Sequence, residues 1–217
     1  MGTEEHTSQQ LLELRNGVTT VVFDIGGVLV AHQPDFEPIA NLLGIPTSPA
    51  GLRQCEDSYW KYRAEYDLGM SDAAYWRAVA ADAGVPQPDD AAVRRLVAGG
   101  IQHWFNPDPE PMQLIQDLSE RGISVAILSN APHYLSKVYR GWELAPMFRT
   151  MVFSADIALA KPDRRIYEYT SRALGKPAHK LLFFDDRRDN VAGAIAAGWQ
   201  AHQWKGADEA RALMGIN

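Results

Sequence analysis

Short apolar runs that alternate with helical patterns constrain the fold of this 217-residue chain most strongly. The candidate strands are residues 18–23, 123–128, 151–153 and 181–184, with 199–204 as a fifth candidate. Their apolar residues are mostly continuous, which is typical of strands covered on both faces. The helical patterns between the later strands are residues 111–120, 163–174 and 190–197. This alternation predicts an α/β fold with a doubly wound, Rossmann-like parallel sheet.

The segment between the first two candidate strands has a different character. It contains no convincing strand, and its helical patterns are residues 36–43, 51–66, 71–83 and 89–97. A structureless connection of this length would be unusual in a compact domain. We therefore predict an α/β core made of residues 14–31 and 107–217, with an all-helical cap subdomain, residues 32–106, inserted after the first strand.

Charge and composition argue against several classes of partner. The net charge is −6 and the basic residues are dispersed, whereas nucleic acids and anionic membranes reward clustered Lys and Arg. No apolar run approaches membrane-spanning length, and the polar N-terminus lacks the profile of a secretory signal. The single cysteine, Cys55, excludes an intrachain disulfide and is expected to be a structural thiol. We expect a cytoplasmic protein, monomeric or homodimeric, with no nucleic-acid or membrane partner.

Polar residues stand where the candidate strands end, and ligands of doubly wound sheets bind beyond the carboxyl ends of the strands. The first run ends in Asp24, the second in Ser129-Asn130, and the fourth in Asp185-Asp186. Lys161 follows the third run. A carboxylate, a hydroxyl, an ammonium and a carboxylate pair are therefore expected to converge on one edge of the sheet.

These four elements, in this order, resemble the haloacid dehalogenase-like (HAD) hydrolase superfamily over residues 18–204. A helical cap inserted after the first motif is a usual feature of that superfamily. The first motif, DIGGVL at residues 24–29, and the cap segment YDLGMS at residues 66–71 are similar to one helical-capped branch. This branch includes sugar-1-phosphate phosphatases and the phosphatase domain of soluble epoxide hydrolase.

The resemblance implies a magnesium-dependent phosphatase for a small phosphorylated metabolite, with sugar phosphates favoured. Asp24 would attack the phosphorus, and a magnesium ion would remove the repulsion between the carboxylate and the phosphate dianion. The implied metal ligands are Asp24, Asp186 and the Gly26 carbonyl. The implied contacts to the phosphoryl group are Ser129, Asn130 and Lys161.

Gly26 is the main departure from the pattern of the superfamily. Many of its phosphatases carry a second Asp at this position, which protonates the leaving group, and such help is typically worth ~100- to 10,000-fold in rate. Three outcomes stay open. We favour a phosphatase that acts on good leaving groups or takes another acid from the cap. The others are a catalytically weak member that binds a phosphorylated ligand or a protein, and a 2-haloacid dehalogenase, which Asp186 disfavours because metal-free dehalogenases have little use for it.

Further residues of the cap segment are candidates for substrate contacts, although a structural role is expected for most. These candidates are His32, Gln33, Arg63, Tyr66 and Asp67. The aromatic residues Trp60, Tyr75 and Trp76 recur at near-helical spacing and are expected in the core of the cap. The sequence does not fix the roles of Asp185 and Asn190, the substrate, or the oligomeric state.

Overall fold

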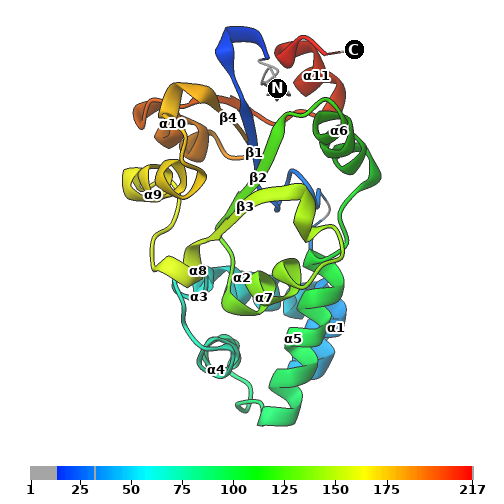
Figure 1. The fold of residues 1–217 in the computed structure, drawn as a ribbon. Coiled ribbons are helices and arrows are strands. Elements are labelled where there is room, and N and C mark those ends of the chain that lie inside the picture. The colour runs from blue at the N-terminus through cyan, green and yellow to red at the C-terminus, as the bar shows by residue number, and fades with distance from the viewer. Residues whose placement is uncertain (1–13, 32, 217) are drawn as a thin grey trace, which may run out of the picture.

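The computed structural model describes residues 14–31 and 33–216. In this part of the chain five parallel strands form one sheet in the order β3-β2-β1-β4-β5 (Figure 1). The strands are β1 (Thr20–Phe23), β2 (Ser124–Ser129), β3 (Phe148–Phe153), β4 (Leu181–Asp185) and β5 (Gln200–Gln203). Phe23 of β1 is in register with Ile127 of β2 and Phe184 of β4, so β2 and β4 run two residues and one residue beyond the end of β1. The predicted parallel sheet is confirmed.

Helices cover both faces of the sheet, as Figure 1 shows. The helices of the core are α6 (Pro109–Glu120), α7 (His133–Arg140), α9 (Arg164–Leu174), α10 (Arg188–Ala196) and α11 (Ala207–Met214). Successive residues of a strand point to opposite faces. Val21 accordingly packs in one apolar cluster with Leu114 of α6, and Val22 in another with Ile166 of α9. The fold is therefore doubly wound.

The first five of the six helices between β1 and β2 lie beyond the carboxyl ends of the strands in Figure 1. They are α1 (Phe36–Leu43), α2 (Pro49–Lys61), α3 (Arg63–Asp67), α4 (Asp72–Asp82) and α5 (Asp90–Trp104). The Ser71 side chain accepts a hydrogen bond from the Ala74 N–H and so caps the start of α4. The helix predicted over residues 51–66 is broken at Tyr62, where φ is −106° and ψ is 8°.

The helical segment is joined to the core at both of its ends. The Asp108 N–H donates to the Leu29 carbonyl over 2.7 Å, and the Asp108 carboxylate accepts from the Ala31 N–H over 2.8 Å. The Tyr139 hydroxyl of α7 donates to the Trp104 carbonyl over 2.9 Å. The outgoing and returning connections therefore run side by side. The division into core and cap stays a prediction.

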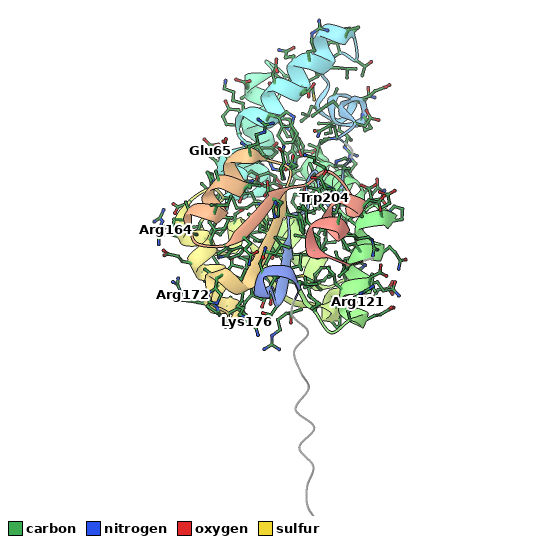
Figure 2. The ribbon with its side chains drawn as sticks, turned by 90° about the horizontal axis from the view of Figure 1, so that it is seen from above. Glu65, Arg121, Arg164, Arg172, Lys176 and Trp204 are labelled. Atoms are coloured by element: carbon green, nitrogen blue, oxygen red, sulfur yellow. The ribbon has the colours of Figure 1, made fainter. Side chains whose placement is uncertain are left out.

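The remaining elements are short. They are α8 (Ser154–Ile157) and three 3₁₀ turns, η1 (Arg15–Gly17), η2 (Ala145–Met147) and η3 (Ala178–Lys180). The sequence patterns did not indicate α7, α8 or α11. No helix among the described residues is both long and apolar enough to cross a membrane. Figure 2 shows labelled basic side chains at opposite sides of the core, in keeping with the dispersed positive charge: Arg121, Arg164, Arg172 and Lys176.

Candidate active site

All the residues predicted to form the site line one cavity of about 560 Å³. They are Asp24, Gly26, Ser129, Asn130, Lys161 and Asp186. They meet because parallel strands bring their carboxyl ends to one edge of the sheet, where β1, β2 and β4 end within two residues of one another. The predicted convergence of the four motifs is what the structure shows.

Lys161 is the centre of the charge arrangement. Its ammonium group lies 2.9 Å from Asp24 Oδ1 and 2.7 Å from Asp185 Oδ2, and it donates to the Leu128 carbonyl over 3.1 Å. The side chain has no solvent exposure. Burial lowers the pKa of Lys161, but the charges of Asp24 and Asp185 outweigh it, so the pKa is raised. The site therefore holds a permanent buried cation.

Asp24 is buried beside that cation. Burial raises the pKa of the Asp24 carboxyl to about 7, the Lys161 charge opposes the rise, and the Asp185 charge adds to it. Hydrogen bonds from Lys161 and Ser129 also favour the ionised form. Only the carboxylate can act as a nucleophile or bind a metal, so Lys161 and Ser129 favour the form of Asp24 that is needed for chemistry.

Side-chain amides fix the position of Lys161 and of its partner carboxylate. Asn130 accepts from the Lys161 N–H over 2.8 Å and donates to the Lys161 carbonyl over 2.9 Å. Asn190 donates to both oxygens of Asp185, at 2.9 and 3.0 Å. Asp185 also accepts from the Arg187 N–H over 2.8 Å. Asp185 and Asn190 thus hold Lys161 in place, which the sequence left open, and a direct contact of Asn130 with substrate stays a prediction.

Three carboxylates could hold a metal ion. Asp24, Asp185 and Asp186 each have an oxygen within 4.8 Å of the others. Gly27 has a φ of 71°, and a Cβ placed on it would lie 2.5 Å from Asp186 Cγ, so only glycine leaves room for that carboxylate. Hard oxygen donors in a crowded anionic site are the ligands that magnesium prefers. The residues present therefore fit such an ion, with Asp185 already saturated by protein donors.

The place beside Gly26 is filled by an indole. A Cβ on Gly26 would lie 3.3 Å from Cζ3 of Trp104, which is tighter than ordinary van der Waals contact. Trp104 ends α5 and its indole N–H donates to the Tyr59 hydroxyl over 3.3 Å. No local pattern in the sequence links Trp104 to Gly26, because the two residues are far apart in the chain. The edge of the Trp104 ring lies directly against the position that a Cβ at residue 26 would take.

The helical segment contributes a buried ion pair to the cavity wall. Arg63 Nε donates to Asp67 Oδ1 over 2.7 Å, and the guanidinium carbon lies 5.3 Å from the centre of the Trp104 ring. Of the candidate contacts, Gln33, Arg63 and Asp67 line the cavity. Tyr66 instead stacks on Tyr75 within the helical segment at 3.9 Å, and His32 lies outside the described residues.

The expected aromatic core of the helical segment is confirmed in part. Tyr75 and Trp76 are buried. Trp60 is 39% exposed and lines the cavity, so it is a wall residue rather than a core residue. An exposed indole at the mouth of a cavity is available to contact a ligand.

The fold and the site together are those of a hydrolase with a Rossmann-like core and an aspartate at the centre of its site. The model of the haloacid dehalogenase-like hydrolase family matches residues 18–198, and the chain belongs to this family. It is similar to a sesquiterpene phosphatase of Aspergillus oryzae, with 25% identity over 181 residues that cover 82% of this chain and 85% of that protein.

Two solved structures share the fold. One is an HAD-family enzyme of Bacteroides thetaiotaomicron in complex with magnesium and inorganic phosphate; its TM-score is 0.66 and its identity 19%, over 87% of this chain and 95% of that one. The other is the L-2-haloacid dehalogenase of Xanthobacter autotrophicus with chloropropionic acid covalently bound; its TM-score is 0.64 and its identity 20%, over 91% and 83% of the chains.

Proposed function

We propose that this hydrolase is a magnesium-dependent phosphatase that takes the phosphoryl group of a small phosphorylated metabolite onto Asp24. The observation that carries the proposal is the buried Lys161 ammonium, 2.9 Å from Asp24 and backed by Asp185. A carboxylate that attacks a phosphate dianion meets strong repulsion, which is worth several kcal/mol at short range in a partly buried site. A fixed cation beside the attacking oxygen offsets this repulsion.

The other residues would position the phosphoryl group. Ser129, buried at the end of β2, would donate to a phosphoryl oxygen, and Asn130 keeps the Lys161 backbone in place. Removing one well-placed donor of this kind typically costs ~100-fold or more in rate. The carboxylate of Asp24 would then carry the phosphoryl group until water displaces it.

Magnesium would be held by Asp24, Asp186 and the Gly26 carbonyl, and when bound it would neutralise charge on the phosphoryl oxygens. Support comes from the three clustered carboxylates and from the glycine that leaves room for Asp186. The Bacteroides enzyme, with the same fold, holds both magnesium and phosphate. A metal-free dehalogenase would have little use for the Asp186 carboxylate, so we favour the phosphatase.

We infer the substrate class from the relatives and from the lining of the cavity. Similarity to the sugar-1-phosphate phosphatase branch favours sugar phosphates, and the Aspergillus relative is named for a sesquiterpene substrate. Polar side chains and the indoles of Trp60 and Trp104 both line the cavity, so it suits a phosphate ester whose organic part is partly apolar. We therefore choose a panel that contains sugar phosphates, an isoprenoid monophosphate and an aryl phosphate.

The test is turnover of this panel with magnesium, with excess chelator, and in Asp24→Asn. We expect phosphate release that needs magnesium and is lost in Asp24→Asn, while the exposed control Asp90→Asn keeps full activity. Tight phosphate-ester binding without any turnover would instead support the catalytically weak alternative. Halide release from 2-haloacids that survives both the chelator and Asp186→Ala would support a dehalogenase.

A further inference from the structure

The cavity needs a proton donor that Gly26 cannot provide. An alkoxide is a poor leaving group, and a positioned acid typically accelerates its departure ~100- to 10,000-fold. Gly26 has no side chain, and Trp104 occupies the adjacent space, 3.3 Å from where a Cβ would lie. A proton for the leaving oxygen therefore has to come from another wall of the cavity.

Few titratable groups on the cavity wall could serve as the proton donor. Among the described residues that line it, the carboxyl groups are those of Asp24, Asp67 and Asp186. Asp24 is the proposed nucleophile, and Asp186 belongs to the carboxylate cluster. The cations Arg63 and Lys161 hold their protons too tightly to release them near neutral pH. Asp67 is the carboxyl group that has no other part in the reaction.

Asp67 is held against the core by its own backbone. It ends α3, and its carbonyl oxygen accepts a hydrogen bond from the hydroxyl of Ser154, the first residue of α8. Gly69, with a φ of 108°, follows closely, and a Cβ on it would lie 3.5 Å from the Ala155 carbonyl oxygen. The close approach of these two chain segments fixes α3 at the strand ends, on the same side of the sheet edge as Asp24.

The Asp67 carboxyl group has one oxygen in use. Arg63 Nε donates to Oδ1 over 2.7 Å, and among the described residues none donates to Oδ2. The side chain is 12% exposed. An acid that loses its proton in a buried site needs a nearby cation for the resulting carboxylate, and Arg63 already stands there.

The surroundings of Asp67 place its titration near neutral pH. Burial raises the pKa of the Asp67 carboxyl to about 6, although the charges of Arg63 and Lys161 oppose the rise. The other titratable groups that face it are the phenols of Tyr75 on α4 and Tyr134 on α7, whose own pKa values burial keeps high, so they stay neutral. Asp67 can therefore both hold and release a proton under ordinary conditions.

We propose that Asp67 is the general acid of the proposed phosphatase reaction, the role that Gly26 cannot perform. This rests on the function proposed above. As an Asp24 oxygen bonds to phosphorus, the bond from phosphorus to the ester oxygen breaks, and its electron pair goes to that oxygen. The Asp67 carboxyl proton passes to the same oxygen, an alcohol leaves, and Asp67 becomes a carboxylate paired with Arg63. Water then attacks the aspartyl-phosphate and returns one proton to Asp67, which frees inorganic phosphate and Asp24.

The experiment compares Asp67→Asn with the native chain on two esters of similar size, cyclohexyl phosphate and para-nitrophenyl phosphate. The value of kcat/KM reports the steps up to departure of the alcohol. Nitrophenolate is a good leaving group and departs without a proton. Cyclohexanolate is a poor leaving group and needs a proton in order to depart. We expect Asp67→Asn to lose at least about 100-fold in kcat/KM on the cyclohexyl ester and less than about 10-fold on the nitrophenyl ester. Equal losses on both esters, or no loss, would overturn the assignment.

The pH dependence of kcat/KM is a second test, because a purely structural role of Asp67 would not change it. The acid form of Asp67 is lost as pH rises, so kcat/KM for the cyclohexyl ester should decrease on the alkaline side of its pH profile. This decrease of kcat/KM should be absent in Asp67→Asn. In Arg63→Met it should occur at higher pH, because the Arg63 charge lowers the Asp67 pKa. Ionisation of the ester itself appears equally in all variants, and Asp90→Asn should match the native profile. An unshifted decrease in both variants would contradict the proposal. Absence of native turnover on either ester would instead refute the phosphatase function.

Discussion

Lys161 and Asp24 form a buried ion pair, with 2.9 Å between Nζ and Oδ1. The pair joins two motifs that are far apart in the chain, and Asp185, the last residue of β4, completes it. A buried cation shared by two carboxylates ties the stability of the fold to the chemistry of the site, because neither carboxylate is compensated without it.

Replacement of Lys161 by methionine should therefore cost both activity and stability. We expect a fall in kcat/KM of ~100-fold or more and a fall in the free energy of unfolding of about 3–5 kcal/mol, since two buried carboxyl groups lose their cation. Urea unfolding and phosphate-ester turnover measure the two effects. Lys205→Met, on an exposed ion pair with Glu209, should change stability by less than about 0.5 kcal/mol. Similar behaviour of the two variants would show that Lys161 carries no structural charge.

An acidic side chain introduced at position 26 should not increase turnover. Gly26→Asp would press its Cβ against Trp104, so we expect no gain in turnover and a loss of roughly 1–3 kcal/mol in unfolding free energy. Gly99→Asp is the matched control, because nothing lies within 4 Å of a Cβ there. Higher activity of Gly26→Asp at unchanged stability would mean that the indole yields and that the acid is simply missing.

Magnesium should stabilise the native chain and lose this effect in Asp186→Asn. A ligand that binds only the folded state adds about 2.7 kcal/mol at 100 times its Kd. We expect the unfolding midpoint to rise with magnesium in the native chain and in Asp90→Asn, and to stay constant in Asp186→Asn. A magnesium-dependent rise in all variants would place the ion elsewhere.

Cys55 should be unreactive in the folded protein. It is fully buried, and burial together with Glu56 raises the pKa of its thiol to about 11, so the reactive thiolate is scarce at pH 8. A thiol reagent at pH 8 should label the chain only as fast as it unfolds, and at once in denaturant. Rapid stoichiometric labelling without denaturant would show that Cys55 is accessible, against the structural role expected for it.

Much of the fold and the site could be predicted, because both depend on where the strands lie and on which residues follow them. Continuous apolar runs located the strands, and parallel pairing then required Asp24, Ser129 and Asp186 to share an edge. The helix over residues 36–43 was predicted with the bounds it has, since Asp35 caps it and Gly44 ends it in a left-handed conformation.

What the sequence could not give depends on contacts between distant residues. The indole of Trp104 against Gly26 joins positions that no local pattern connects. The break at Tyr62, after which Asp67 belongs to a separate short helix, is not indicated by the helical pattern over residues 51–66. Sequence reasoning therefore brought the proposed nucleophile and its cation together. It named Asp67 only among several candidate contacts and did not indicate the proton-donor role that we propose for it.

The central claim is that Asp24 takes a phosphoryl group, and trapping of that intermediate tests it most directly. Radiolabelled acetyl phosphate is mixed with the enzyme and magnesium, and the reaction is quenched in acid at millisecond times. We expect acid-stable label on the peptide that contains Asp24, none with excess chelator, and none in Asp24→Asn. Release of labelled phosphate with no protein-bound label at any time, at a rate that Asp24→Asn leaves unchanged, would contradict the account.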